Sequence, residues 1–206
     1  MVRNVTHAIA ILALVAVLAL PGAGAPGEKA GDLRIALNNL LTEHVALAAS
    51  ATLGALSGNK AQFQAAAAQL DANSDDLIRA VGSVYGPDAE RAFGPLWKKH
   101  IGFVVDYTTG LATNNKTKQD KAVQDLLNYT REFGAFINSA TKTLPTDTVA
   151  ELVREHILTL KAVIDAQKAN NQPAVYGNLR KAMAHMQMIA DPLSDAIVKQ
   201  FPQRFR

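Results

Sequence analysis

The sequence predicts an all-α fold, in which six antiparallel helices form three tandem helical hairpins of an up-and-down bundle. Three histidines, His44, His100 and His156, follow one another at intervals of 56 residues, and a leucine lies four residues before each of them. Within each 56-residue repeat the apolar residues return every three or four positions, which is the spacing of one helix face. A fixed period of this length indicates a repeated supersecondary unit, here one helical hairpin.

Each repeat is divided by a polar break, and the repeats are linked by residues that favour helix starts. The breaks are residues 57–60, 114–117 and 170–173, and the links are residues 86–88 and 144–147. Glycine, asparagine and proline mark turns and helix ends in such positions. We expect helices over residues 32–57, 60–85, 88–113, 117–141, 146–169 and 173–199. Pro95 and Pro192 fall inside two of them, where the missing N–H donor predicts a kink or a restart.

The first 25 residues have the features of a signal peptide. Arg3 precedes an unbroken apolar run over residues 8–20, and small residues follow up to Ala25. This run is shorter than the roughly 20 apolar residues that span a bilayer. We expect export to the periplasm or the extracellular space, with residues 1–25 as a signal peptide cleaved between Ala23 and Ala25. An uncleaved N-terminal anchor is the alternative, and no transmembrane span is expected in the mature chain.

The remainder of the chain has the composition of one globular domain. Of the 206 residues of the full sequence, 49% are hydrophobic and 19% charged, and cysteine is absent. We expect a single all-helical domain over residues 32–202 with repeats at 32–86, 87–143 and 144–200. The lack of cysteine excludes disulfides, thiolate nucleophiles and cysteine-ligated metals. The balance of 21 basic against 18 acidic residues provides no basic stripe, so nucleic acid is not an expected partner.

A layer of six polar residues is predicted at one height inside the bundle. Residues equidistant from the turn of an antiparallel hairpin lie side by side. This rule gives three facing pairs: His44 with Asn73, His100 with Tyr129, and His156 with His185. Apolar residues at helical spacing flank each member, which directs all six side chains inward. Because an unpaired buried polar group costs about 1–3 kcal/mol, these groups must satisfy one another, hold water or hold a ligand.

One interpretation of the layer is a metal site. Neutral imidazole suits copper, zinc, nickel and iron. The expected centre is the facing pair His156 and His185, with a third ligand from Met188, or from His44 or His100 if the bundle closes on itself. Copper is favoured because three methionines lie within three residues of His185, and thioether with imidazole is a donor set that suits Cu(I).

The alternative is a non-catalytic structural or protein-interaction module, in which the layer only fixes the fold as a buried asparagine does in a coiled coil. An enzyme is not expected. Glu43 and Glu155 directly precede histidines, whereas helical di-iron bundles need a three-residue spacing to place both ligands on one face. Zinc-protease, serine-hydrolase and phosphate-loop motifs are also missing. Both interpretations therefore describe a binding or structural protein.

Three stretches, residues 67–77, 96–108 and 184–193, resemble a family of exported bacterial helical proteins that are often labelled copper amine oxidase-like. The similarity covers most of residues 32–202. The resemblance implies export and an all-helical structure. Copper amine oxidases proper use a tyrosine-derived quinone on a β-sandwich, and the sequence has no such motif, so oxidase chemistry is not implied.

Overall fold

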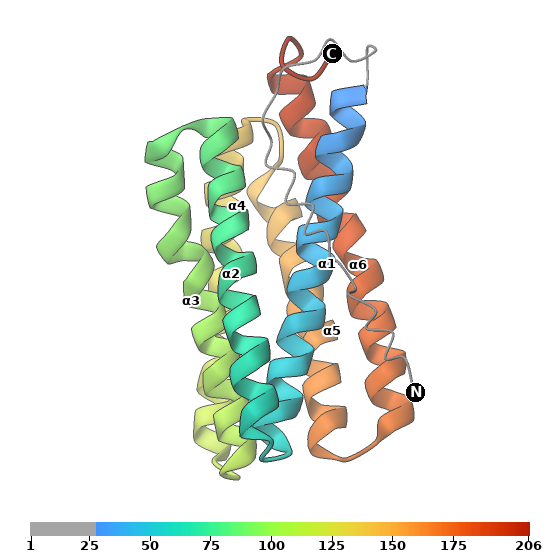
Figure 1. Ribbon diagram of the computed structural model, residues 1–206. Coiled ribbons are helices and arrows are strands. Elements are labelled where there is room, and N and C mark those ends of the chain that lie inside the picture. The colour runs from blue at the N-terminus through green and yellow to red at the C-terminus, as the bar shows by residue number, and fades with distance from the viewer. Residues whose placement is uncertain (1–27) are drawn as a thin grey trace, which may run out of the picture.

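The computed structural model describes residues 28–206 and confirms the all-α up-and-down bundle (Figure 1). Its helices in chain order are α1 (Glu28–Leu56), α2 (Lys60–Tyr85), α3 (Pro87–Ala112), α4 (Lys116–Thr141), α5 (Thr146–Lys168) and α6 (Gln172–Gln200). Consecutive helices pack side by side, so α1–α2, α3–α4 and α5–α6 are three hairpins. The part of the chain described contains no strand. The predicted signal peptide, residues 1–25, lies outside the described residues.

The three hairpin turns repeat one local structure. Asn59, Asn115 and Asn171 precede α2, α4 and α6, and each side chain accepts a hydrogen bond from the backbone N–H three residues later. Such caps satisfy N–H groups that have no partner within the helix. The residue before each cap has a positive φ, which glycine and asparagine adopt most readily. The 56-residue period therefore extends to the backbone of the turns.

The two interior prolines do not interrupt their helices. Pro95 lies inside continuous α3 and Pro192 inside continuous α6, so neither helix restarts at its proline, and the alternative of a kink stays a prediction. Around Pro95, the side chains of Phe93 and Trp97 are buried in the core. Burial on both sides of the proline offsets the lost backbone hydrogen bond, because each large apolar side chain gains about 2 kcal/mol or more from leaving water.

The bundle closes on itself, since α6 packs against α1 (Figure 1). Asn38 of α1 donates a hydrogen bond of 2.9 Å to Asp191 of α6, and Arg34 pairs with the same carboxylate. Across the interior, α1, α3 and α5 all contact one another. The three repeats thus surround a pseudo-threefold axis with their first helices innermost. Equivalent residues on the inner faces of these helices are brought together at that axis.

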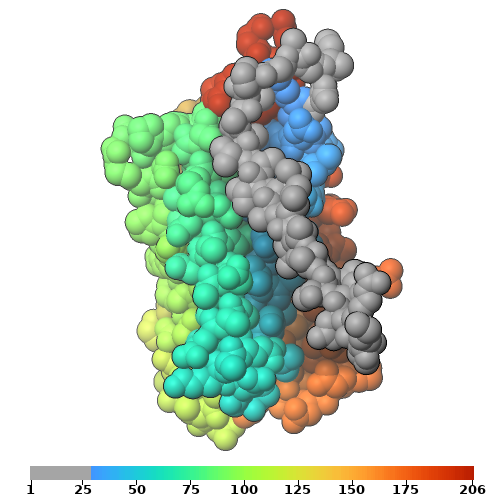
Figure 2. Space-filling view, viewed as in Figure 1, coloured from blue at the N-terminus to red at the C-terminus, as the bar shows by residue number. Residues whose placement is uncertain are grey.

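The two ends of the bundle differ. The hairpin turns lie at one end, while the start of α1 and the C-terminal residues lie at the other, as the blue and red segments of Figures 1 and 2 show. The first helix of each hairpin therefore runs away from the terminal end and the second returns to it. Within residues 28–206, no helix combines the length and apolar character needed to cross a membrane.

Candidate functional site

Three histidines meet in the middle of the bundle, one from each hairpin. His44 of α1, His100 of α3 and His156 of α5 are all buried, with at most 8% of each residue exposed. The Nε2 atoms of His44 and His100 are 3.4 Å apart. The ring centroid of His44 lies 5.4 Å from that of His100 and 6.0 Å from that of His156. These three residues, the histidine triad, are repeat equivalents that meet near the pseudo-threefold axis.

Aromatic side chains enclose one side of the triad. The ring of Trp97 lies 5.0 Å from His44 and 4.7 Å from His100 between centroids, and it meets His100 edge to face. Tyr129 of α4 stacks on His100 at 5.1 Å. These rings exclude water from the imidazoles, which makes a charge on the triad unfavourable.

The triad is therefore neutral at pH 7. Burial lowers the pKa of His44 well below its ordinary value, and repulsion by His100 and His156 lowers it further. Burial lowers the pKa of His100 to about 4 against a small opposing effect of the Trp97 backbone. Burial, with smaller contributions from His100 and His185, lowers the pKa of His156 to about 3. Three neutral imidazoles, the form that binds metals, are thus held together.

Several polar atoms around the triad have no hydrogen-bond partner. They are the Nδ1 atoms of His44, His100 and His156, the indole N–H of Trp97 and the hydroxyl of Tyr129. Burial also raises the pKa of Tyr129 well above its ordinary value, helped by Glu132, so its hydroxyl stays protonated. Native proteins leave few buried polar groups unsatisfied, and a cluster of them calls for an explanation such as a bound ion or ligand.

The predicted pair His156 and His185 does not form the centre of the site. His185 is only half-buried, and its Nε2 donates to the carbonyl oxygen of Leu152 at 2.8 Å. Asn73, the equivalent residue two repeats earlier, also donates to a backbone carbonyl oxygen, that of Leu40 at 3.1 Å. Of the three predicted pairs, His100 and Tyr129 do lie against each other, whereas Asn73 and His185 bond to backbone carbonyls, because distance from the turn fixes height alone. The return helices lie outside the inner three, so Asn73 and His185 reach a neighbouring backbone instead of the triad.

The expectation that Met188 faces inward is also wrong. Met188 is 59% exposed, whereas Met186 is 1% exposed and faces the interior. The buried face of α6 is formed by Ala182, Met186 and Ala190, which recur every four residues. The prediction placed His185 at the centre of this buried face of α6, but His185 lies at its edge. The rotation of the helix therefore places Met186, and not Met188, in the interior.

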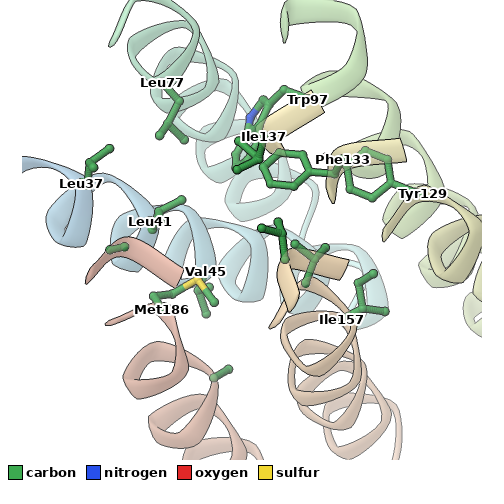
Figure 3. Close-up of a cluster of buried hydrophobic side chains, with 14 of the residues drawn as sticks. Leu37, Leu41, Val45, Leu77, Trp97, Tyr129, Phe133, Ile137, Ile157 and Met186 are labelled. Carbon is green, nitrogen blue, oxygen red and sulfur yellow. The ribbon is translucent and has the colours of Figure 1, made fainter. Parts of the chain in front are cut away.

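A cavity of about 280 Å³ extends from the triad toward the terminal end of the bundle. All six helices line it, and Figure 3 shows side chains from each of them around the same interior space. His44 is the last lining residue of α1, His100 the last of α3 and Tyr129 the first of α4. The triad and Tyr129 therefore form the floor of the cavity. Its other end is lined by Lys29, Asp32 and Arg204.

The three imidazoles of the triad are not arranged as a complete coordination sphere. Among residues 28–206, no group of three or more His, Asp or Glu side chains is positioned to hold a metal ion. The 3.4 Å between the Nε2 atoms of His44 and His100 nevertheless fits two ligands of one ion at about 2.0–2.1 Å in tetrahedral geometry. A third ligand from His156 requires its imidazole to turn toward the other two.

Sequence reasoning missed Trp97 and the cavity, and it preferred Met188 to Met186 as the inward methionine. Trp97 lies three residues before His100, so the helical spacing that places both on one face was available to find it. Met186 follows from the four-residue series of small or apolar residues on α6. The cavity had no such signal, because its volume depends on how the side chains of six helices fit together.

No family model, curated protein or solved structure shows a significant match to this chain. The functional argument therefore depends on the geometry and chemistry of the residues themselves.

Proposed function

We propose that the protein is an exported, non-catalytic helical bundle that binds a transition metal, with copper favoured, through His44, His100 and His156. The observation that carries the proposal is the histidine triad itself, three buried imidazoles with pKa values lowered by burial and with unpartnered Nδ1 atoms. Three neutral histidines are a common ligand set for first-row metals. Of the five residues predicted as ligands, His185 and Met188 are replaced in this proposal by Met186.

Copper is favoured by the sulfur donor beside the triad. Met186 lines the same cavity as the three histidines and is almost completely buried. Imidazole and thioether together form a soft donor set that suits Cu(I), whereas zinc and nickel gain little from a thioether. Because burial lowers the pKa of all three imidazoles, that of His100 to about 4, protons compete with the metal only weakly for as long as the protein stays folded.

One observation favours the structural alternative. The Nε2 atoms of His44 and His100 are close enough to share a hydrogen bond, and Asn73 and His185 each donate to a backbone carbonyl oxygen. In the structural alternative, the layer of polar residues fixes how the helices align with one another in a repetitive bundle, and it holds no ion. The two functions differ in whether a metal stabilises the fold through the triad.

The decisive experiment measures thermal unfolding of the purified protein with and without Cu and Zn, together with its metal content by elemental analysis. A bound metal raises the unfolding temperature in proportion to the logarithm of its concentration. We expect His44→Gln, His100→Gln and His156→Gln each to lose most of this response. His185→Gln is the matched control and should keep it, because His185 bonds to the Leu152 carbonyl.

Two outcomes would overturn the metal site. An equal metal response in the wild type and in all triad variants would place the binding elsewhere, and no response in any protein would leave only the structural role. In the structural case each triad variant would lose about 1–2 kcal/mol of stability whether or not metal is present.

Export is a separate part of the proposal and rests on Arg3 and the apolar run of residues 8–20. The intact mass of the protein recovered from the exported fraction should show the loss of about 22–25 residues. Recovery of the full-length chain in the cytoplasm alone would contradict it. Membership of the exported helical family stays a prediction from the three resembling stretches.

A further inference from the structure

The cavity above the histidine triad is long and narrow. Its lining extends along α1 from Lys29 to His44, which corresponds to roughly 22 Å at 1.5 Å of rise per residue. Its volume of about 280 Å³ is nearly twice that of an engineered cavity of about 150 Å³ that binds benzene. The shape fits one extended chain better than a compact ring system.

The walls of the cavity are apolar. Phe93, Trp97, Phe133 and Phe136 lie together near the floor, with ring centroids 5.4 to 6.3 Å apart. Leucine, isoleucine and valine side chains from all six helices complete the lining. Apolar cavities of this kind stay dry and take up apolar ligands, because water there has too few polar partners.

The two ends of the cavity differ in charge. At the floor, the triad histidines and the aromatic rings beside them are buried, so an ionised head group would lose its contact with water there. At the mouth, Lys29 and Arg204 are cationic and only Asp32 is anionic. The Arg204 guanidinium, which is exposed, is positioned by hydrogen bonds of 2.9 Å to the carbonyl oxygens of Ser83 and Val84. An anionic head group is favoured at this end only.

We propose that the cavity binds a fatty acid, with its hydrocarbon tail directed down the bundle axis to Trp97 and its carboxylate at the mouth beside Lys29 and Arg204. The proposed metal ligands lie at the floor of the same cavity, but binding of the fatty acid does not require a metal. The charged head stays in contact with water, where ionisation is inexpensive, and the tail replaces empty space with apolar contacts.

The single tryptophan of the chain provides the test, because Trp97 lines the cavity near its floor. Bromine quenches tryptophan fluorescence at short range. The metal-free protein, kept in a chelator, is titrated with 12-bromododecanoate, which carries bromine at the tail end, and with 2-bromododecanoate, which carries it beside the carboxylate. We expect saturable quenching by the first compound, and binding of the second with much weaker quenching.

A pair of variants in α2 separates binding in the cavity from binding on the surface. Ala80 lines the cavity and Ala72 is exposed on the same helix. Ala80→Phe should weaken dodecanoate binding about tenfold or more, and Ala72→Phe should leave it unchanged. Circular dichroism checks that both variants fold, and Ala140→Phe in α4, which also lines the cavity, replaces Ala80→Phe if that variant does not.

The charge at the mouth is tested with Lys29→Gln, which should weaken binding of dodecanoate but not of uncharged dodecanol. The absence of saturable quenching in the wild-type protein would overturn the proposal. Stronger quenching by 2-bromododecanoate would overturn the orientation of the ligand. Equal binding by the cavity variant and its control would remove the cavity as the site. Because no metal is present, these results do not depend on the metal-binding experiment.

Discussion

The charge state of the histidine triad couples folding to pH. In the unfolded chain each histidine titrates near 6.5, whereas burial lowers the pKa of His100 to about 4 and that of His156 to about 3, and lowers that of His44 as well. Between these values the unfolded state binds more protons than the folded state, so stability falls as pH falls. Above pH 6.5 the histidines are neutral in both states and do not make stability depend on pH. Below pH 6.5 the free energy of unfolding falls progressively.

We therefore expect the free energy of unfolding to fall by about 3–4 kcal/mol between pH 6 and pH 5, since up to three protons bind on unfolding. Urea unfolding in metal-free buffer at a series of pH values measures this slope. His156→Gln should reduce the slope by about one third, while Asn73→Ala should leave it unchanged. A flat profile between pH 6 and 5 would show that the triad is not buried as described.

Two buried tyrosines provide a comparison between an unpartnered and a partnered hydroxyl. The hydroxyl of Tyr129 has no hydrogen-bond partner, whereas that of Tyr107 donates to Asp165. Tyr129→Phe should leave the free energy of unfolding unchanged or raise it by about 1 kcal/mol, because it removes an unsatisfied group. Tyr107→Phe should lower it by about 1–2 kcal/mol. Chemical denaturation of the two variants measures both, and a loss on Tyr129→Phe as large as on Tyr107→Phe would contradict this assignment.

At the scale of single helices, close approach between neighbours depends on particular glycines. A Cβ atom built on Gly134 of α4 would collide with the carbonyl oxygen of Thr146 and lie 3.3 Å from the backbone nitrogen of Ala150. Gly102 of α3 is exposed and has open space around its Cα. The first glycine thus permits contact between α4 and α5, and the second has no packing role.

Gly134→Ala should destabilise the protein by about 1–3 kcal/mol, because the backbones of α4 and α5 must separate. Gly102→Ala should stabilise it by about 0.5–1 kcal/mol, because alanine favours the helix. Thermal unfolding of the two single variants gives both values. Stabilisation by both substitutions would mean that the α4–α5 contact is looser than the structure shows.

The helices could be predicted from the sequence because their signals are local. The polar breaks at residues 57–60, 114–117 and 170–173 predicted the starts of α2, α4 and α6 to within one residue. The effect of Pro95 could not be predicted in the same way, since its cost is outweighed by core contacts of Phe93 and Trp97 that only the folded bundle provides. Local rules thus give the elements, and tertiary packing decides where those rules are overridden.

At the scale of the whole molecule, the histidine site could not be predicted from one hairpin, because its three residues come from three different hairpins. The repeat correctly predicted that His44, His100 and His156 are buried. The three histidines meet at one point because α6 packs against α1 and closes the circle of six helices. The sequence did not predict this closure. Once the circle of helices closes, the equivalent inward residues of α1, α3 and α5 must converge. His185 lies on a return helix, α6, and must therefore lie farther from the axis.

The cavity is the second property of the whole molecule. Empty volume costs about 24 cal/mol per Å³, so about 280 Å³ corresponds to roughly 7 kcal/mol, a large share of the 5–15 kcal/mol that stabilises a typical domain. A void of this size is easier to understand as a ligand site than as imperfect packing, because occupation by an apolar chain would recover most of that cost.

The same void makes the protein sensitive to pressure, because unfolding eliminates it. The volume change of unfolding ranges from about −20 to −100 mL/mol and scales with internal void volume, so we expect a value near −100 mL/mol for the ligand-free protein. Fluorescence of Trp97 under hydrostatic pressure measures it. Ala80→Phe, which fills part of the cavity, should make the change less negative, and Ala72→Phe on the outer face of α2 should not. Saturating dodecanoate should make the volume change of the wild-type protein less negative, as Ala80→Phe does. Identical volume changes in all three proteins would show that the cavity is filled or collapsed in solution.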